Sequence, residues 1–168
     1  MDVVLYPDDP LTQKAEPFDC VGPEAPQLAK NMIETMDAHD GVGLAGPQVG
    51  IAKRIFVLCE PDQEPMCFIN PEILEMEGRE EGEEGCLSMP GIYAKNVPRA
   101  TRVRVKALDA EGQPFEMEAH GFLARIIQHE YDHLEGILFP DRLDIITRGI
   151  VLQDWTEVRQ ELLSASGE

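Results

Sequence analysis

The sequence predicts an α+β fold, in which short, mainly antiparallel strands surround a central metal-binding helix and a C-terminal helix packs outside. Three observations predict it. Residues 101–108 and 115–119 alternate apolar and polar side chains on the two sides of a turn, as an antiparallel hairpin does. A helix follows from about His120 to Leu134 and ends at Gly136, a residue type that commonly terminates helices. A last helix is expected at about residues 147–164, because apolar side chains recur on one face (Ile150, Val151, Trp155, Val158 and Leu162).

The first fifty residues are predicted to hold a short strand at residues 3–6, a helix and a glycine-rich loop. The helix runs from about Glu24 to His39, and its apolar stripe indicates core packing. Residues 41–50 contain four glycines and a proline, which exclude a stable helix and let the backbone approach another group closely. No Lys-Ser/Thr pair follows the glycines, so a phosphate-binding loop is excluded, and taken alone the stretch is most simply a tight connection.

The middle of the chain is predicted to contain strands and an acidic loop. Residues 54–60 form a buried strand around four consecutive apolar side chains, and residues 68–71 and 72–77 form further short strands. The run from Glu75 to Glu84 is acidic and broken by two glycines, which indicates a solvated loop. Turn-forming residues then surround Cys86.

Length, charge and composition limit the possible functions. A chain of 168 residues suits one domain, so residues 1–168 are expected to form a single catalytic domain. The net charge of −18, from 32 acidic and 14 basic residues without a basic block, predicts no direct nucleic-acid binding. No apolar run is long enough to cross a bilayer, and the N-terminus lacks the basic region of a secretion signal, so we expect no membrane association and a cytoplasmic protein.

The four cysteines are Cys20, Cys59, Cys67 and Cys86. Two disulfides are one interpretation, but core thiols and a metal ligand are favoured in a cytoplasmic chain of this size. Cys59 and Cys67 lie among apolar residues and are expected in the core, whereas Cys86 lies between turn-forming residues.

The central helix carries the clearest chemical signal, His129-Glu130-x-x-His133. Two histidines four residues apart lie on one helical face and can bind one metal ion, and the intervening glutamate can reach a water at the remaining position. Two histidines are too few for a catalytic site, and Cys86 is the best candidate for the third ligand, because a thiolate binds borderline divalent metals well. The alternative is a helix whose imidazoles are satisfied by neighbouring groups, since this pattern also occurs in unrelated proteins.

Three segments together resemble the signature motifs of the peptide deformylase family. Residues 41–48 are similar to its Gly-x-Gly-x-Ala-x-x-Gln pattern, residues 84–88 match its Glu-Gly-Cys-Leu-Ser motif, and residues 128–136 match its Gln-His-Glu-x-Asp-His-Leu-x-Gly motif. Their order and spacing agree, and the resemblance extends from about Asp9 to Arg142. It implies a hydrolase of protein biosynthesis that removes the formyl group from the N-terminal formylmethionine of nascent peptides and releases formate.

The resemblance also implies roles for individual residues. Cys86, His129 and His133 bind the metal, which is commonly Fe(II) in this family, with Ni(II), Co(II) or Zn(II) as substitutes. Glu130 takes a proton from the attacking water and later protonates the departing amine. The Gln48 amide and the Leu87 backbone N–H donate hydrogen bonds to the developing oxyanion.

Three further expectations concern the surroundings of the metal. The Gly43 backbone is expected to form a narrow slot that admits formyl and excludes acetyl. Glu84, held by Arg99, is expected to accept a hydrogen bond from a ligating imidazole. The pocket for the methionine side chain has three candidates, with plain core packing as the alternative for the two on the helix (Val42, Phe122 and Ile126).

The sequence departs from the family pattern in two places. Gly46 stands where alanine is usual, which adds flexibility beside Pro47 and Gln48. Relatives that dock on the ribosome do so through a basic C-terminal helix, whereas residues 147–168 carry two arginines against four acidic residues. The charge of this region leaves that docking mode unsupported.

Two other functions stay open at this point. A zinc peptidase of the His-Glu-x-x-His type is disfavoured, because such enzymes usually draw a third ligand from downstream and no histidine follows His133. A non-catalytic metal- or peptide-binding relative is opposed by the intact Glu130, Gln48 and Cys86, while Gly46 leaves it open.

Overall fold

The computed structural model of the chain describes residues 1–167 and contains two antiparallel sheets. The larger sheet has the strand order β1-β2-β3-β6-β7, and the smaller one pairs β4 with β5. The strands are Gly43–Ala45 (β1), Ile55–Leu58 (β2), Met66–Glu77 (β3), Glu80–Gly85 (β4), Tyr93–Arg99 (β5), Arg102–Leu108 (β6) and Pro114–His120 (β7). Together with the helices, this architecture confirms the predicted α+β class.

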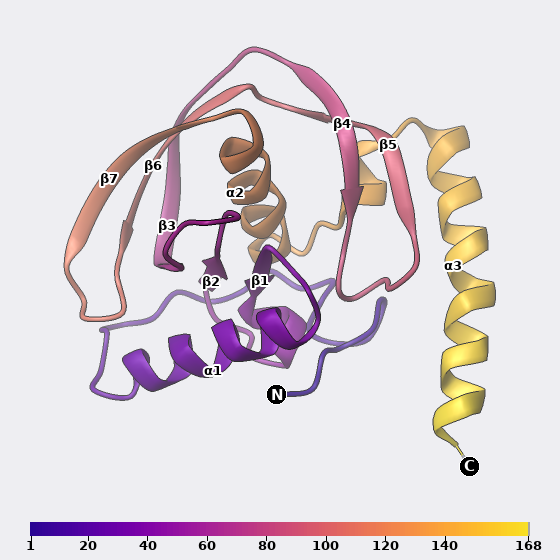
Figure 1. Cartoon of the computed structure of the whole chain (residues 1–168), viewed down its shortest axis with the longest axis horizontal. Coiled ribbons are helices and arrows are strands. Elements are labelled where there is room, and N and C mark those ends of the chain that lie inside the picture. Colours follow the sequence, from indigo (N-terminus) through magenta and orange to yellow (C-terminus); the bar gives the residue numbers. More distant parts are fainter. Residues whose placement is uncertain (168) are drawn as a thin grey trace.

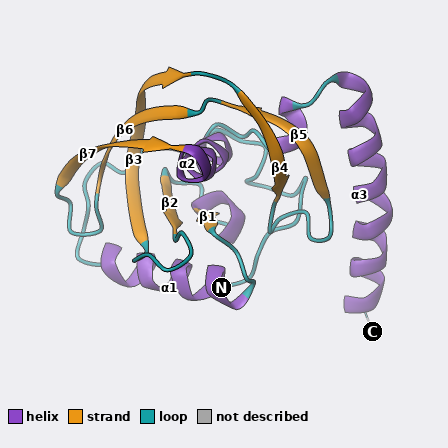
Figure 2. Cartoon of the chain, turned by 45° about the horizontal axis from the view of Figure 1, so that its top comes forward, coloured by secondary structure: helices purple, strands orange, loops and turns teal. Residues whose placement is uncertain are grey.

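The described residues also form three α-helices, of which the middle one is central. They are α1 (Ala25–Ala38), α2 (Gly121–Leu134) and α3 (Ile145–Ser166), with short 3-10 helices at Gly46–Val49 (η1) and Phe139–Arg142 (η2). Strands of both sheets surround α2, α1 lies beside β1 and β2, and α3 stands at one side beyond β4 and β5 (Figure 1). The same arrangement is seen from another direction in Figure 2.

The predicted hairpin and central helix pack against each other and form the main core. Alternate residues of β6 (Val103, Val105 and Ala107) point inward and join Ala124 and Ile127 of α2 in one buried cluster. Phe56 and Phe68 stack within it, with their ring centroids 4.7 Å apart. This packing buries one stripe of α2 and leaves its neighbouring stripe free to face β4.

Three expectations about strands need correction. The acidic run at residues 75–84 is not a solvated loop, because it completes β3 and forms most of β4. Arg102 of β6 pairs with Glu75 and Glu77 of β3, so cross-strand cations compensate the acidic side chains there. Residues 68–77 form one strand with a register shift after Ile69 rather than two strands. Residues 3–6 form no strand: residues 3–5 have no regular secondary structure, Tyr6 begins a turn, and none of them pairs with a strand among the described residues.

Helix α3 is longer than predicted, and only part of its expected apolar face is covered. The Asp144 carboxylate accepts hydrogen bonds from the Ile146 and Thr147 N–H groups and so starts the helix two residues early. Val151 and Trp155 are buried, but Ile150 is 58% exposed and Leu162 is 39% exposed. Glu168, one of the acidic residues counted for this region, lies outside the described residues.

Candidate metal centre

Helix α2 presents His129 and His133 on one face, as their spacing predicts. Both imidazoles are buried, and their ring centroids lie 5.0 Å apart. Cys86, which follows β4 directly, brings its Sγ to 3.3 Å from the His133 Nε2. The structure therefore brings together the three residues that the sequence singles out as ligands.

The donor set fits a divalent metal ion. The ligand atoms of Cys86, His129 and His133 all lie within 4.8 Å of one another, so small movements would let them converge on one centre about 2.0–2.3 Å from each. One thiolate and two imidazoles suit borderline divalent metals such as iron and zinc. Three protein ligands leave a coordination position for water or substrate, as catalytic rather than structural sites do.

Glu84 orients His129 through the ring nitrogen that points away from the other candidate ligands. The His129 Nδ1 donates to the Glu84 Oε1 at 2.7 Å, which leaves the Nε2 of that ring free to bind metal. Burial alone raises the pKa of Glu84, but hydrogen bonds from Arg99 and His129 outweigh burial and hold that pKa well below its usual range. Glu84 is therefore an ionised carboxylate under a ligating imidazole, and its predicted contacts with His129 and Arg99 are present.

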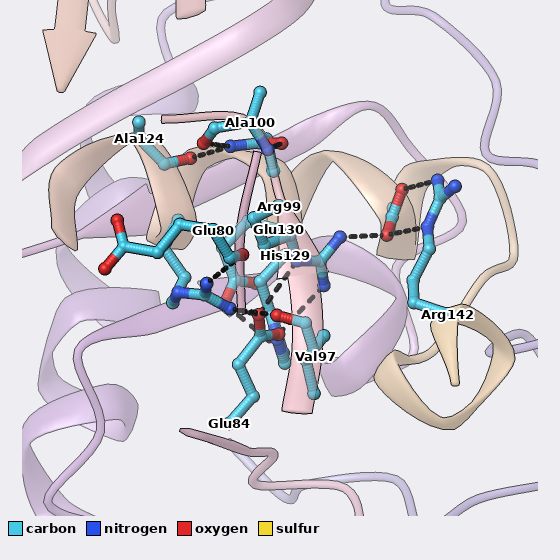
Figure 3. A network of polar contacts seen from close by, with 12 residues as sticks. Glu80, Glu84, Val97, Arg99, Ala100, Ala124, His129, Glu130 and Arg142 are labelled. Carbon is cyan, nitrogen blue, oxygen red and sulfur yellow. Dashed lines mark hydrogen bonds and ion pairs between the residues drawn. The ribbon is translucent and has the colours of Figure 1, made fainter. Parts of the chain in front are cut away.

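A chain of buried charges continues from Glu84 to the far side of α2 (Figure 3). Arg99 donates to both Glu84 oxygens at 2.8 Å and to the Asp132 carboxylate at 2.5 Å. Arg142, which is exposed and ends the chain of charges, donates to both Asp132 oxygens at 2.7 and 3.0 Å. Charges alternate along this chain, so each buried group has a compensating partner.

Sequence reasoning did not identify Arg125 or Asp132 as part of this network. Arg125 lies one turn before His129 on α2 and donates to Glu84 at 2.6 Å and to the carbonyls of Val97 and Glu80 at 2.9 and 3.0 Å. The one indication in the sequence was that these two charged residues flank His129 on a helix that packs in the core. Arg125 thereby ties both strands of the small sheet to the helix that carries the histidines.

Glu130 faces the same centre from the other side of His129. Its Oε1 lies 4.0 Å from the His129 Nε2, and its Oε2 is buried without a hydrogen-bond partner among residues 1–167. Burial raises the pKa of this carboxyl to about 7, and a cation bound beside it would draw that pKa down. An unpartnered buried carboxylate oxygen next to three ligands is suited to exchanging a proton with a bound water.

Gln48 is fixed at both ends of its amide. Its Oε1 accepts from the Ala45 N–H at 2.9 Å, and its Nε2 donates to the Ser88 Oγ at 3.2 Å and the Cys86 Sγ at 3.3 Å. These contacts hold the side chain firmly although Gly46 precedes it. Gly46 itself is tightly enclosed: a Cβ added there would lie 2.8 and 2.9 Å from two backbone carbonyl oxygens, those of Ile51 and Lys53.

A cavity of about 600 Å³ opens beside the centre and is lined by Gly43, Gln48, Leu87 and Glu130. The Leu87 N–H donates to no group among the described residues, so it is available to a ligand. Of the three pocket candidates, all line this cavity, but their burial differs: Phe122 is 51% exposed, Val42 is 37% exposed and Ile126 is 4% exposed. Ile126 also belongs to the main core, whereas the exposure of Phe122 argues against plain core packing.

The other thiols are separate from this centre. All four cysteines are free. Cys59 and Cys67, expected in the core, are half-buried and pack against a buried cluster, and burial raises the pKa of the Cys67 thiol to about 12. Within residues 1–167, no helix combines the length and the apolar character needed to cross a bilayer.

Comparisons with known proteins agree with one another. A family model described as polypeptide deformylase matches residues 1–148. The chain is 43% identical to the peptide deformylase of Alkalilimnicola ehrlichii over 172 aligned residues, which cover 100% of this chain and 96% of that protein. It is 46% identical to the peptide deformylase of Chromohalobacter salexigens, with 91% of each chain covered.

Solved structures give the same result. The fold is similar to the crystal structure of peptide deformylase from Thermus thermophilus, with a TM-score of 0.89, 42% identity and coverage of 95% of this chain and 97% of that one. It is also similar to a peptide deformylase from Legionella pneumophila, with a TM-score of 0.89, 38% identity and 96% of each chain covered.

Proposed function

This chain belongs to the peptide deformylase family, and we propose how its residues carry out the family reaction, the metal-dependent removal of the formyl group from the N-terminus of nascent peptides. One observation carries the proposal. Cys86, His129 and His133 converge beside the buried Glu130, at the wall of a cavity of about 600 Å³. A cavity of that volume has room for the end of a formylmethionyl peptide.

We assign Cys86, His129 and His133 as the ligands of one divalent ion. When bound there, the ion supplies Lewis acidity, which lowers the pKa of a water at its remaining position and polarises the formyl carbonyl. We propose Fe(II) as the ion in the cell, with Ni(II), Co(II) or Zn(II) as substitutes, because the mixed sulfur and nitrogen donors suit all four.

Glu130 moves the proton. As the water oxygen adds to the formyl carbon, the Glu130 carboxylate accepts a water proton. The same carboxyl then delivers that proton to the peptide nitrogen as the C–N bond breaks, giving formate and a free N-terminal amine. The unpartnered Oε2 and the raised pKa of Glu130 support this role.

Gln48 and Leu87 stabilise the negative charge that develops on the formyl oxygen. Gln48 and Leu87 both line the cavity, and the Gln48 amide can turn an N–H toward substrate in place of Cys86 once that thiolate binds the metal. One such donor typically contributes about 10²–10³ in rate. Gly43 lies beside Glu130 and limits the space next to the reacting carbon. Val42 and Phe122 form the open part of the pocket for the methionine side chain, with Ile126 at its base.

The partners we propose are nascent peptides that carry formylmethionine, met in the cytoplasm. Docking on the ribosome through α3 is not expected. Both arginines of α3 are engaged in ion pairs, Arg148 with Asp141 at 3.1 Å and Arg159 with Asp8 at 2.8 Å. The helix therefore presents no free basic face to ribosomal RNA.

The test is formate release from formyl-Met-Ala-Ser by protein purified anaerobically and reconstituted in turn with Fe(II), Ni(II) and Zn(II). Release should vanish in Glu130→Ala while the metal stays bound, and should persist in Glu157→Ala, which removes an exposed acid on α3. Cleavage of an internal amide instead would indicate a zinc peptidase. Stoichiometric metal binding without release by any metal form would indicate a non-catalytic relative.

A further inference from the structure

The N-terminal segment, residues 3–6, contacts both loops that carry the oxyanion donors. The Val4 N–H donates to the Gln48 carbonyl at 2.7 Å, and the Tyr6 N–H donates to the Ser88 carbonyl at 3.0 Å. Val4 has no regular secondary structure and Tyr6 begins a turn, yet their two N–H groups reach different loops. This segment therefore spans from Gln48 to the residue after Leu87.

The two loops need such a connection. Gln48 lies in η1, a 3-10 helix of four residues between Ala45 and Gly50, and so short a helix takes its position from its surroundings. Ser88 belongs to a turn 40 residues further along the chain. Besides the direct side-chain bonds from Gln48 to Ser88 and Cys86, the N-terminal segment supplies a backbone contact to each loop.

The segment is itself held in place from outside. Val4, Leu5 and Tyr6 pack against the buried cluster between β5 and α3. The Trp155 Nε1 donates to the Tyr6 carbonyl at 2.9 Å, and Arg159 pairs with Asp8. In Figure 1 the indigo N-terminal segment runs from near α1 toward the sheet of β4 and β5, and α3 lies beyond that sheet.

We propose that Val4 and Tyr6 are positioning residues for deformylation. Through their backbone N–H groups they fix the spacing between the Gln48 amide and the Leu87 N–H, and so the place where the oxyanion is stabilised. This inference rests on the roles proposed above for Gln48 and Leu87. Neither Val4 nor Tyr6 is a metal ligand or lines the cavity itself, so their effect should fall on the rate of the chemical step rather than on metal or substrate binding.

The experiment compares Val4→Pro with Val4→Ala in the metal-loaded enzyme. Both remove the valine side chain, but only proline removes the N–H that donates to Gln48. We expect Val4→Pro to lower kcat about tenfold, with KM and metal content within about twofold of the parent, because small displacements of catalytic groups are costly. Val4→Ala should keep nearly full kcat. Equal kcat values for the two variants would overturn the proposal.

Gln48→Ala, alone and combined with Val4→Pro, shows through which group the segment acts. If Val4 acts through Gln48, Val4→Pro should add little to the loss caused by Gln48→Ala. A full additional tenfold loss in the double variant would overturn this route. A Gln48→Ala variant with parental kcat would instead refute the proposed role of Gln48, so the two failures are distinguishable.

If Val4→Pro does not fold, the amide of Val4 can be exchanged for an ester by nonsense suppression with the α-hydroxy analogue of valine. The ester lacks the N–H but keeps the side chain. The expected result is the same fall in kcat at unchanged KM, and an ester variant with parental kcat would overturn the proposal. The sulfur-to-cobalt absorption of the Co(II) form should be unchanged, which separates loss of positioning from damage to the metal site.

Discussion

Glu84 lies under three hydrogen-bond donors, Arg99, Arg125 and His129, and this crowding makes it the supporting residue of the metal centre. Glu84→Gln keeps the shape but removes the charge. We expect metal affinity to fall by about 10–100-fold, the usual cost of losing a carboxylate behind a ligating imidazole. Chelator competition would measure the dissociation constant, with the exposed neighbour in Glu83→Gln as the control. Equal metal retention in both variants would contradict the role assigned to Glu84.

Gly43 lies so close to Glu130 that there is no room for a side chain at position 43. A Cβ at Gly43 would lie 2.5 Å from the Glu130 Oε1 and 2.9 Å from its carboxyl carbon, so Gly43→Ala must displace the proton acceptor. We expect kcat to fall about 100-fold with metal content unchanged. Gly149→Ala is the matched control, because a Cβ there meets nothing within 4 Å. Full activity of Gly43→Ala would refute both this account and the proposed slot for formyl.

At the scale of residues, the sequence predicts which three side chains lie together at the candidate metal centre, but only part of what supports them. His129 and His133 are found through their four-residue spacing, and Cys86 through the lack of another suitable thiol. Arg125 and Asp132 carry no such signal, because a charged residue on a helix usually faces solvent. Only the packing of α2 inside two sheets turns them inward.

At the scale of elements, α3 is held to the body by a narrow contact. Trp155 is 2% exposed, whereas Ile150, on the same helix, is 58% exposed. We expect Trp155→Ala to lower the free energy of unfolding by about 3–5 kcal/mol, and Ile150→Ala to change it by less than about 0.5 kcal/mol. Urea denaturation of the metal-loaded protein would measure both. Similar losses in the two variants would mean that α3 packs through the face that is exposed here.

The hairpin β6–β7 was predictable because its strands alternate apolar and polar side chains, which imposes a clear period on the sequence. Helix α2 is buried on nearly all sides, and its histidine spacing and the glycine after it predicted it instead. Strand β4 was not predictable, since its residues are mostly acidic and its stability comes from partners distant in sequence, such as Arg99. The sequence did not predict the exposure of Ile150 and Leu162 either. An apolar stripe indicates which face can be buried but not how much of it a neighbour covers.

At the scale of the whole molecule, the net charge of −18 sets how stability responds to salt. The bases of β6 pair with acids on both neighbouring strands, yet such exposed pairs contribute little and many acids have no counterpart. We expect the Tm to rise by about 2–4 °C between 0.1 and 1 M KCl, because screening weakens the repulsion among carboxylates. Differential scanning calorimetry at saturating metal would measure it, and a falling Tm would mean that the ion pairs of β6 dominate.

The bonds from Trp155 to Tyr6 and from Arg159 to Asp8 join positions 149 and 151 residues apart. A ribosome makes the chain from its N-terminus, so Tyr6 and Asp8 are synthesised long before Trp155 and Arg159. Until those two later residues are made, nothing on the α3 side secures the N-terminal segment against Gln48 and Ser88. Tyr6 and Asp8 are thus made early but secured late, and their contacts with Trp155 and Arg159 can form only after those residues have been synthesised.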